Sequence, residues 1–434
     1  MPNIRLPRRM WPMLTALAAL AGIALTPLTA CTESTAPPRG RVVLLGGLFD
    51  LTGNWSTLGE ASKAAMELAV EDVNQYLAGN AADLEFAAAV ENTRLDPDTA
   101  LQKAQALRAR GIQLLIGPQS SAEVARLKPF VDANGLLLVS QSSTAGSLAI
   151  AGDNVFRFTP TDSMEGVAIS ALMWDDGVRV VVPVWRDDPG NAGLVTAVRA
   201  RFAALGGTVL EGLAYDAHTT DFTATADNLA DQVDAAIRQH GRGAVAVYLA
   251  AFDEVVALFG AATPHPILGS VAWYGSDGVA NSAALVGDRT ASEFAVRVGY
   301  PSPAFAVEEG ARDIWQPLAE RIRARTGRDP DAYALTVYDA VWVIARGYVA
   351  SGATSDIEKL KHAFTTAAST HYGATGWCVL NAAGDRKYGD FAYWAIRMDG
   401  GAPHWERVAH YESRTGRLVR LPAPTQTTSL RGEP

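Results

Sequence analysis

The feature that most constrains the fold is a regular alternation of short apolar runs with segments of helical periodicity, which begins at Arg41. Most of these runs are continuously hydrophobic, as parallel strands covered on both faces are. Strands that alternate with helices in this way predict an α/β fold with parallel sheets. The apolar runs occupy residues 42–48, 84–90, 112–116, 136–139, 178–184, 208–213 and 244–249.

The alternation occurs twice, over about 41–158 and again over about 160–275. In each half a capping-box pattern, with a capping side chain three residues before a glutamate, predicts the start of a helix. These patterns are Ser120-Ser121-Ala122-Glu123 and Asp162-Ser163-Met164-Glu165. We therefore predict two Rossmann-like lobes, each with three layers.

The last third of the chain breaks the alternation. Helical periodicity at 314–322 and 335–345 is followed by two strand-like segments, 375–380 and 391–398, which read as antiparallel strands with a turn at 383–385. These elements are too few for a third domain, so we expect the chain to cross between the lobes several times and to leave a cleft between them. The expected parts are lobe 1 (41–158 plus about 300–352), lobe 2 (159–299 plus about 353–412) and a poorly ordered tail (413–434).

The first thirty residues have the pattern of an export signal. Arg5, Arg8 and Arg9 precede an uncharged apolar stretch that is too short to span a membrane comfortably. The stretch ends in Leu28-Thr29-Ala30-Cys31, which resembles the lipobox of bacterial lipoproteins. We predict a signal peptide over 1–30, lipid attachment at Cys31, a flexible tether over 31–40 and a position on the cell envelope, either in the periplasm or on the outer face of the cytoplasmic membrane. The alternative is an ordinary signal peptide with an incidental cysteine.

Charge and motifs exclude several classes of function. The 37 basic and 46 acidic residues give a net charge of −9, which argues against nucleic acid as a partner. Cys31 and Cys378 are the two cysteines, so a disulfide framework is excluded, and we expect Cys378 to be a small buried apolar residue. The chain has no nucleophile elbow, P-loop, zinc-binding helix motif or dinucleotide fingerprint. We predict a protein that is not an enzyme and that needs no cofactor or metal.

Short landmarks in a fixed order resemble the type I solute-binding proteins of ABC transporters, in the branch that includes the leucine-binding proteins. The resemblance covers about 42–411 and implies a type I periplasmic binding protein fold. Each landmark is weak alone, but their order and spacing are specific. They are Leu51-Thr52-Gly53, Asn92 with Asp96-Pro97, Ile116-Gly117 with Ser120-Ser121, Phe156-Arg157, Gly275-Ser276-Asp277-Gly278, Tyr338-Asp339-Ala340 and Thr375-Gly376.

The resemblance also implies how a ligand with one negative and one positive end is held. Ser121 and Thr144 match hydroxyl groups that meet the ligand's carboxylate, and Ser142 matches a backbone contact. Asp277 matches the acidic residue that receives the ammonium group. The alternatives are a helix cap for Ser121, a solvated serine-rich loop for Ser142 and Thr144, and a turn aspartate for Asp277.

Two positions depart from the family pattern. Phe252 stands where family members often have a tyrosine that shares the ammonium, and it offers a ring face without a hydroxyl. The segment from Trp185 to Asn191 is more highly charged than the usual aromatic-glycine loop, so its charges could contact a polar ligand side chain. Trp185 could form a wall of the pocket or belong to the core.

These observations predict a monomeric, lipid-anchored binding protein that delivers an amino acid or a similar small zwitterion to an ABC permease with its ATPase. A ligand-sensing receptor of the same fold, acting on a signalling partner, is the first alternative. An enzyme with an unfamiliar site in the cleft is the second. Neighbouring genes for a permease and an ATPase would favour transport over sensing.

Overall fold

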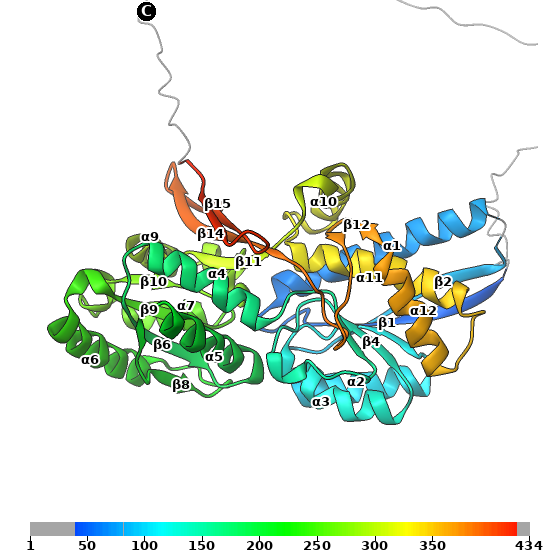
Figure 1. Ribbon diagram of the computed structural model, residues 1–434, viewed down its shortest axis with the longest axis horizontal. Helices are drawn as coiled ribbons and strands as arrows, with labels where there is room; N and C mark the ends of the chain where they lie inside the picture. Colours follow the sequence, from blue (N-terminus) through cyan, green and yellow to red (C-terminus); the bar gives the residue numbers. More distant parts are fainter. Residues whose placement is uncertain (1–39, 81, 423–434) are drawn as a thin grey trace, which may run out of the picture. The chain divides into compact units, whose positions relative to one another are not determined.

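The structure is a computed structural model that describes residues 40–80 and 82–422. The predicted signal peptide, Cys31 as the predicted site of lipid attachment, most of the predicted tether and the last twelve residues of the predicted tail lie outside this range. Within it, the chain forms parallel sheets covered by helices on both faces (Figure 1). The predicted α/β fold class is therefore confirmed.

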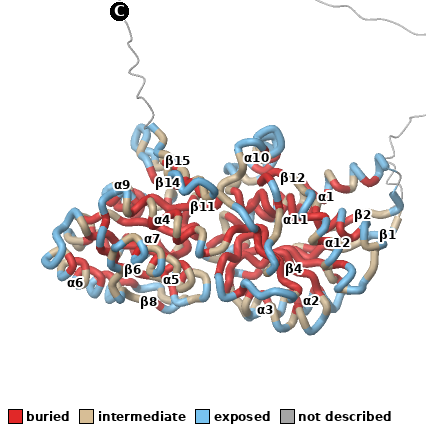
Figure 2. The backbone as a smooth tube through the Cα atoms, in the orientation of Figure 1, coloured by how far each residue is buried: buried red, intermediate tan, exposed pale blue. Residues whose placement is uncertain are grey.

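Lobe 1 is built on a parallel five-stranded sheet with the strand order β2-β1-β3-β4-β5. The register of β1 against β2 runs from Arg41 opposite Leu84 to Phe49 opposite Asn92. Most side chains of the short central strands are fully buried, which Figure 2 shows as red along β4. The strands are β1 (Arg41–Phe49), β2 (Leu84–Asn92), β3 (Leu114–Ile116), β4 (Leu137–Ser140) and β5 (Val155–Arg157).

Helices cover both faces of this sheet. One face packs against α1, α11 and α12, and the other packs against α2 and α3. These two cores are formed by alternate residues of the same strands, so that Leu114 belongs to the first core and Leu115 to the second. The helices of lobe 1 are α1 (Ser56–Gly79), α2 (Pro97–Ala109), α3 (Ser121–Ala133), α10 (Arg312–Thr326), α11 (Ala332–Ala350) and α12 (Ile357–Ser369).

Lobe 2 repeats the plan with a parallel sheet of order β10-β9-β6-β7, in which β8 also pairs with β6. Helices α4 and α5 cover one face, and α6, α7 and α9 cover the other. The predicted run at 208–213 is split here into two short strands. The elements are α4 (Asp162–Asp175), β6 (Val180–Arg186), α5 (Pro189–Ala204), β7 (Thr208–Val209), β8 (Leu213–Tyr215), α6 (Thr223–His240), β9 (Val245–Ala250), α7 (Val255–Ala262), β10 (Ala272–Tyr274), α8 (Ala283–Gly287) and α9 (Arg289–Val298).

A third, antiparallel sheet packs against lobe 2. Its order is β11-β14-β15-β16, and Tyr393 of β14 lies in the core beside α4, where its hydroxyl donates a hydrogen bond to the carbonyl of Ala168. The predicted strand at 391–398 is confirmed, but it pairs with β11 and β15 and not with 375–380. The strands are β11 (Ser302–Ala306), β14 (Asp390–Asp399), β15 (Ala402–Glu412) and β16 (Arg417–Arg420), and the separate hairpin consists of β12 (Tyr372–Gly373) and β13 (Gly376–Trp377).

Two expectations about the parts of the chain differ from the structure. Residues from 353 onward were expected in lobe 2, yet α12 packs against α11 and its Phe364 ring contacts Phe156 in the core of lobe 1. The connection from α11 to α12 is short, and helices joined by short connections usually pack side by side. The poorly ordered tail was predicted to start at residue 413, but the chain continues there into a tight turn and then into β16, which pairs with β15.

The chain passes between the lobes near 158–161, 302–311 and 386–390. The first passage follows β5 and the third precedes β14. These repeated crossings agree with the predicted hinge architecture, and they place the carboxyl ends of both parallel sheets at the same interlobe boundary, where ligands of such sheets usually bind.

Candidate functional site

A small cavity lies between the two lobes at the carboxyl ends of their sheets. Its volume is about 20 Å³, which holds roughly one water molecule. A larger groove of about 460 Å³ lies beside it and shares Ser120 and Phe252 with its wall. The cavity is lined by Trp55, Ser120, Ser121 and Thr144 from lobe 1 and by Gly190, Asn191, Leu194, Phe252 and Asp277 from lobe 2.

The first wall of the cavity is the N-terminus of α3. Ser120 caps this helix in the predicted capping box, because its hydroxyl accepts the N–H of Glu123 and the Glu123 carboxylate accepts the N–H of Ser120. The backbone N–H groups of Ser121 and Ala122 in the first turn have no carbonyl acceptor within the helix. Exposed N–H groups and the positive end of the helix dipole favour a negatively charged group here.

Ser121 also fixes the loop that follows β4. Its hydroxyl oxygen accepts the N–H groups of Thr144 and Ala145 and lies 3.0 Å from the Ser143 hydroxyl. Arg157 holds the same loop from the other side, because one guanidinium nitrogen donates to the carbonyl of Ala145 at 2.6 Å. Two buried side chains therefore determine where Thr144 lies in the cavity wall.

The second wall is the N-terminus of α5 from lobe 2. Asp188 caps this helix by accepting the N–H of Asn191, and Arg186 donates a hydrogen bond to the other Asp188 oxygen. A Cβ atom on Gly190 would lie 3.4 Å from the Ser121 hydroxyl oxygen, so the first turns of α3 and α5 face each other closely. One cavity thus receives the positive ends of two helix dipoles, one from each lobe.

Asp277 borders the cavity, and two further buried carboxyl groups, Asp162 and Glu165, lie close to it without lining the cavity; we call the three residues the acidic cluster. The Asp277 carboxylate accepts a hydrogen bond from the Tyr333 hydroxyl at 2.9 Å, and its backbone N–H donates to Glu165. Asp162 lies against α5, because a Cβ atom on Gly193 would be 2.2 Å from an Asp162 oxygen. Both oxygens of Asp162 and one of Glu165 have no hydrogen-bond partner.

Burial raises the pKa of each carboxyl group in the acidic cluster. The pKa of Asp277 rises to about 6, although the Tyr333 hydroxyl opposes the increase. The pKa of Asp162 rises to about 8 through burial, and the negative charge of Asp277 adds to the increase. Burial and then the charges of Asp277 and Asp162 raise the pKa of Glu165. A cation at this end of the cavity would reverse these shifts by favouring the charged forms.

Contacts in and beside the cavity hold the lobes together. The Asp253 N–H donates to the carbonyl of Asn54 at 2.9 Å, and the Asn54 side chain donates to Glu254 at 3.2 Å. The rings of Trp55 and Phe252 meet across the boundary with centroids 4.6 Å apart. The cavity is too small for an amino acid, so a ligand of that size can bind only if these lobes move apart.

The structure brings four of the predicted ligand residues to this cavity: Ser121, Thr144, Phe252 and Asp277. Ser142 is buried behind the wall, where its hydroxyl donates to the carbonyl of Gln119. Trp185 packs against the core between β6 and α5 and lines neither the cavity nor the groove. Of the two roles considered for Trp185, a wall of the pocket or a part of the core, the structure matches the second.

Several residues of the site were not found from the sequence. Tyr333 comes from α11, far along the chain, and its hydroxyl donates to the Asp277 carboxylate, although Tyr333 does not itself line the cavity. Asp162 and Glu165 were interpreted as a capping box, but the N-cap of α4 is Thr161, without a side-chain hydrogen bond. The pattern was misleading because both carboxyl groups turn inward. Trp55 lies just before α1, where no motif marked it.

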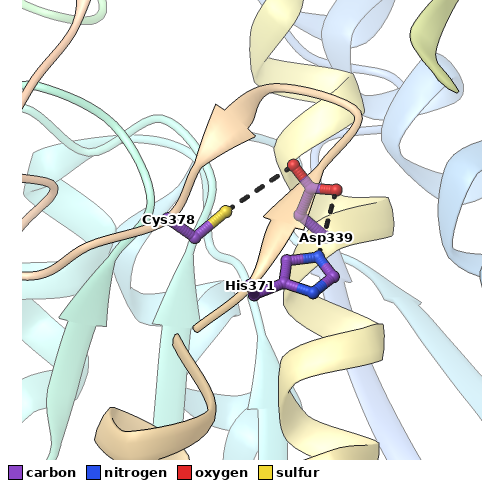
Figure 3. Close-up of side chains that lie close together, drawn as sticks. All are labelled: Asp339, His371 and Cys378. Atoms are coloured by element: carbon purple, nitrogen blue, oxygen red, sulfur yellow. Dashed lines mark hydrogen bonds and ion pairs between the residues drawn. The ribbon is translucent and has the colours of Figure 1, made fainter. Parts of the chain in front are cut away.

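A second cluster of potential metal ligands, Asp339, His371 and Cys378, lies in lobe 1 (Figure 3). The Asp339 carboxylate already accepts the N–H groups of Ala374 and Thr375. These hydrogen bonds connect the landmark that contains Asp339 to the landmark that begins at Thr375. Burial raises the pKa of the Cys378 thiol, so it stays protonated, as a small buried residue should. We assign this cluster a structural role.

Comparison with known proteins identifies the family. The profile described as the receptor family ligand binding region matches residues 61–398. The chain belongs to this family. It is 30% identical to an uncharacterised protein of Methanocaldococcus jannaschii over 92% of this chain and 97% of that one. It is 24% identical to a leucine-, isoleucine-, valine-, threonine- and alanine-binding protein of Pseudomonas aeruginosa, over 89% of this chain and 95% of that one. A leucine-binding protein of Thermotoga maritima has a TM-score of 0.68 at 18% identity, with 87% of this chain and 99% of that chain covered.

The predicted resemblance is thus confirmed, and the protein is a type I periplasmic binding protein with a solute-binding role. The family consists of binding proteins, which confirms the prediction that this chain is not an enzyme. In the part of the chain that the structure describes, no helix has both the length and the apolar character needed to cross a membrane.

Proposed function

We propose that this protein is the extracytoplasmic substrate-binding component of an ABC importer and that it captures an amino acid or a related small zwitterion between its lobes. The observation that carries the proposal is the polarity of a single interlobe cavity. Two helix N-termini and the carboxyl group of Asp277 border the same cavity. A ligand with a carboxylate and an ammonium group a few bonds apart matches this polarity.

The ligands for which two relatives are named support the chemical class of the proposed ligand. The Pseudomonas protein is named for binding small aliphatic amino acids, and the Thermotoga protein for binding leucine. Export and lipid attachment at Cys31 are proposed from the sequence pattern at the N-terminus, which lies outside the described residues. We also propose that the protein is monomeric and that it delivers its ligand to a membrane permease.

The test is a thermal-shift screen of the purified protein against single amino acids, followed by calorimetric titration of those that stabilise it. A ligand that binds only the folded state raises the melting temperature by mass action. Asp277→Asn is expected to weaken binding by about two to three decades, because it leaves a buried ammonium without a charged partner. Asp234→Asn, at an exposed position of α6, is the control and should bind as the wild type does.

Unchanged affinity in Asp277→Asn would refute the role of Asp277. The absence of stabilisation by any amino acid would refute the ligand class.

A further inference from the structure

Asn191 lines the interlobe cavity, and one of its two side-chain polar atoms has no partner. The residue lies in the first turn of α5 and is 2% exposed. Its Nδ2 atom donates a hydrogen bond to Asp188 at 3.0 Å, whereas its Oδ1 atom accepts none from residues 40–80 and 82–422. Because Oδ1 is unpartnered and yet not fully enclosed, the small accessible part of this side chain includes an unused acceptor at the cavity wall.

Neighbouring groups determine the orientation of the Asn191 amide. The Asp188 carboxylate can only accept hydrogen bonds, and it already accepts the Asn191 backbone N–H at 2.9 Å. The side-chain amide must therefore present its NH2 group to Asp188, which turns the carbonyl oxygen away from the carboxylate. Arg186 holds the carboxylate in turn, because its Nε atom donates to the same Asp188 oxygen at 2.9 Å. The acceptor is thus held in one orientation before a ligand binds.

The other groups in the cavity wall do not use this acceptor. The Ser120 hydroxyl donates to Glu123 at 2.7 Å, so its hydrogen is already engaged. Leu194 lies one turn along α5 from Asn191, on the same face of the helix. The apolar side chains that line the cavity are Trp55, Leu194 and Phe252. A ligand side chain that is partly apolar and carries one donor matches this combination.

A ligand that fills the closed cavity has to supply the missing donor. Buried polar groups are almost always hydrogen-bonded, and covering an acceptor without giving it a donor weakens binding. Under the proposed function the ammonium group of the ligand pairs with Asp277, which also lines the cavity. The donor for Asn191 is then a group of the ligand's side chain.

We propose that Asn191 makes the site prefer amino acids whose side chain bears a hydroxyl or amide donor over apolar amino acids of the same shape. This inference rests on the proposed function, because it assumes that an amino acid occupies the cavity. It adds to that function the class of the side chain. Asn191 ends the segment 185–191, whose sequence departs from the family pattern, so the preference would be particular to this chain.

The test compares two pairs of ligands that have nearly the same shape. Threonine is titrated against valine, and asparagine against leucine, by calorimetry with the purified full chain. Threonine and asparagine are each expected to bind at least about tenfold more tightly than their apolar counterparts, because a site with a fixed acceptor rejects an analogue that lacks the donor. An entirely apolar wall would give the opposite order, since the ligand's donor would then be buried without a partner.

Asn191→Leu keeps nearly the same shape and removes the acceptor. We expect the threonine-to-valine affinity ratio to fall by at least about tenfold in this variant. Asn228→Leu is the matched control, because it makes the same substitution at an exposed position of α6 and should leave the ratio unchanged. Asn191→Ala removes the acceptor with a smaller side chain, and it should also lower the ratio should Asn191→Leu fail to fold.

Equal or tighter binding of valine and leucine to the wild type would overturn the proposal, because Asn191 would then contribute nothing to the choice of side chain. An unchanged ratio in Asn191→Leu would overturn the role of that residue. If none of the four ligands binds, this inference fails, and the thermal-shift screen shows whether the proposed function fails with it. Stabilisation by some other amino acid would retain the proposed function, whereas stabilisation by none would refute both.

Discussion

The ion pair between Arg157 and Asp385 joins two of the crossings between the lobes, and its removal tests how the hinge is stabilised. Arg157 ends β5 just before the first crossing, and Asp385 precedes the third. Both side chains are 1% exposed, and the Arg157 Nε atom lies 2.6 Å from an Asp385 oxygen. The same guanidinium donates to the carbonyl groups of Ala145 and Ser143. Arg157→Met would therefore leave a buried carboxylate and a buried carbonyl without donors.

Loss of one member of a buried ion pair costs about 3–5 kcal/mol, and the Ala145 carbonyl places Arg157→Met toward the upper end of that range. The whole protein is expected to be stable by only about 5–15 kcal/mol, so the loss is a large fraction. Arg157→Met/Asp385→Leu removes both charges and should recover a substantial part of the loss, because a buried pair can be replaced by apolar side chains at little cost.

The assay is urea denaturation followed by circular dichroism and by tryptophan fluorescence, so that separate unfolding of the lobes would be seen as two transitions. Arg289→Met is the matched control. It breaks an ion pair on α9 in which the arginine side chain is 82% exposed, and it should change the free energy of unfolding by less than about 1 kcal/mol. The reasoning would be refuted if Arg157→Met were as mild as this control or if the double variant were no more stable than Arg157→Met.

Two further predictions concern α1 and the acidic cluster. Gly59→Ala should lower the free energy of unfolding by about 1–3 kcal/mol or more, because its Cβ would lie 1.6 Å from the Asp50 carbonyl oxygen. Gly79→Ala, on the same helix with open space around it, should instead stabilise by about 0.5–1 kcal/mol, and similar denaturation midpoints for the two variants would contradict this. The folded pKa of Asp162 lies at about 8, above its ordinary 3.8, so the folded protein retains a proton that the unfolded chain loses and stability falls as the pH rises between these values. Asp162→Asn should lose less stability than the wild type between pH 5 and pH 8 in urea denaturation, and equal losses would show that this carboxyl group is not the cause.

Local patterns predicted those parts of the site that depend on neighbouring residues. The capping box at Ser120 forms as expected because the hydroxyl and the carboxylate that satisfy each other lie on one turn of helix. The same pattern at Asp162 failed, since its carboxyl group turns toward a pocket built with residues from α5 and η4 (Asp277–Val279). A local pattern shows that a carboxyl group can cap a helix, but distant contacts decide whether it does.

Long-range packing explains the other differences. The lobe to which α12 belongs depends on whether its apolar face meets α11 or the third sheet, and its sequence is compatible with both. Tyr333 was missed because a tyrosine on a buried helix face is usually a core residue, and its functional contact exists only after the two lobes have met.

The positions of the polar groups couple ligand binding to closure of the lobes. The negative end of a ligand would meet α3 from lobe 1 and α5 from lobe 2. Its positive end would meet Asp277 from lobe 2, which is held by Tyr333 from lobe 1. Neither end of the ligand is fully bound by one lobe, so most of the binding energy is available only in the closed arrangement. The apparent affinity is then the intrinsic affinity multiplied by the fraction of molecules that can close. Substitutions at Asn54, which bonds the lobes without lining the cavity, should therefore change affinity without changing which ligand is preferred.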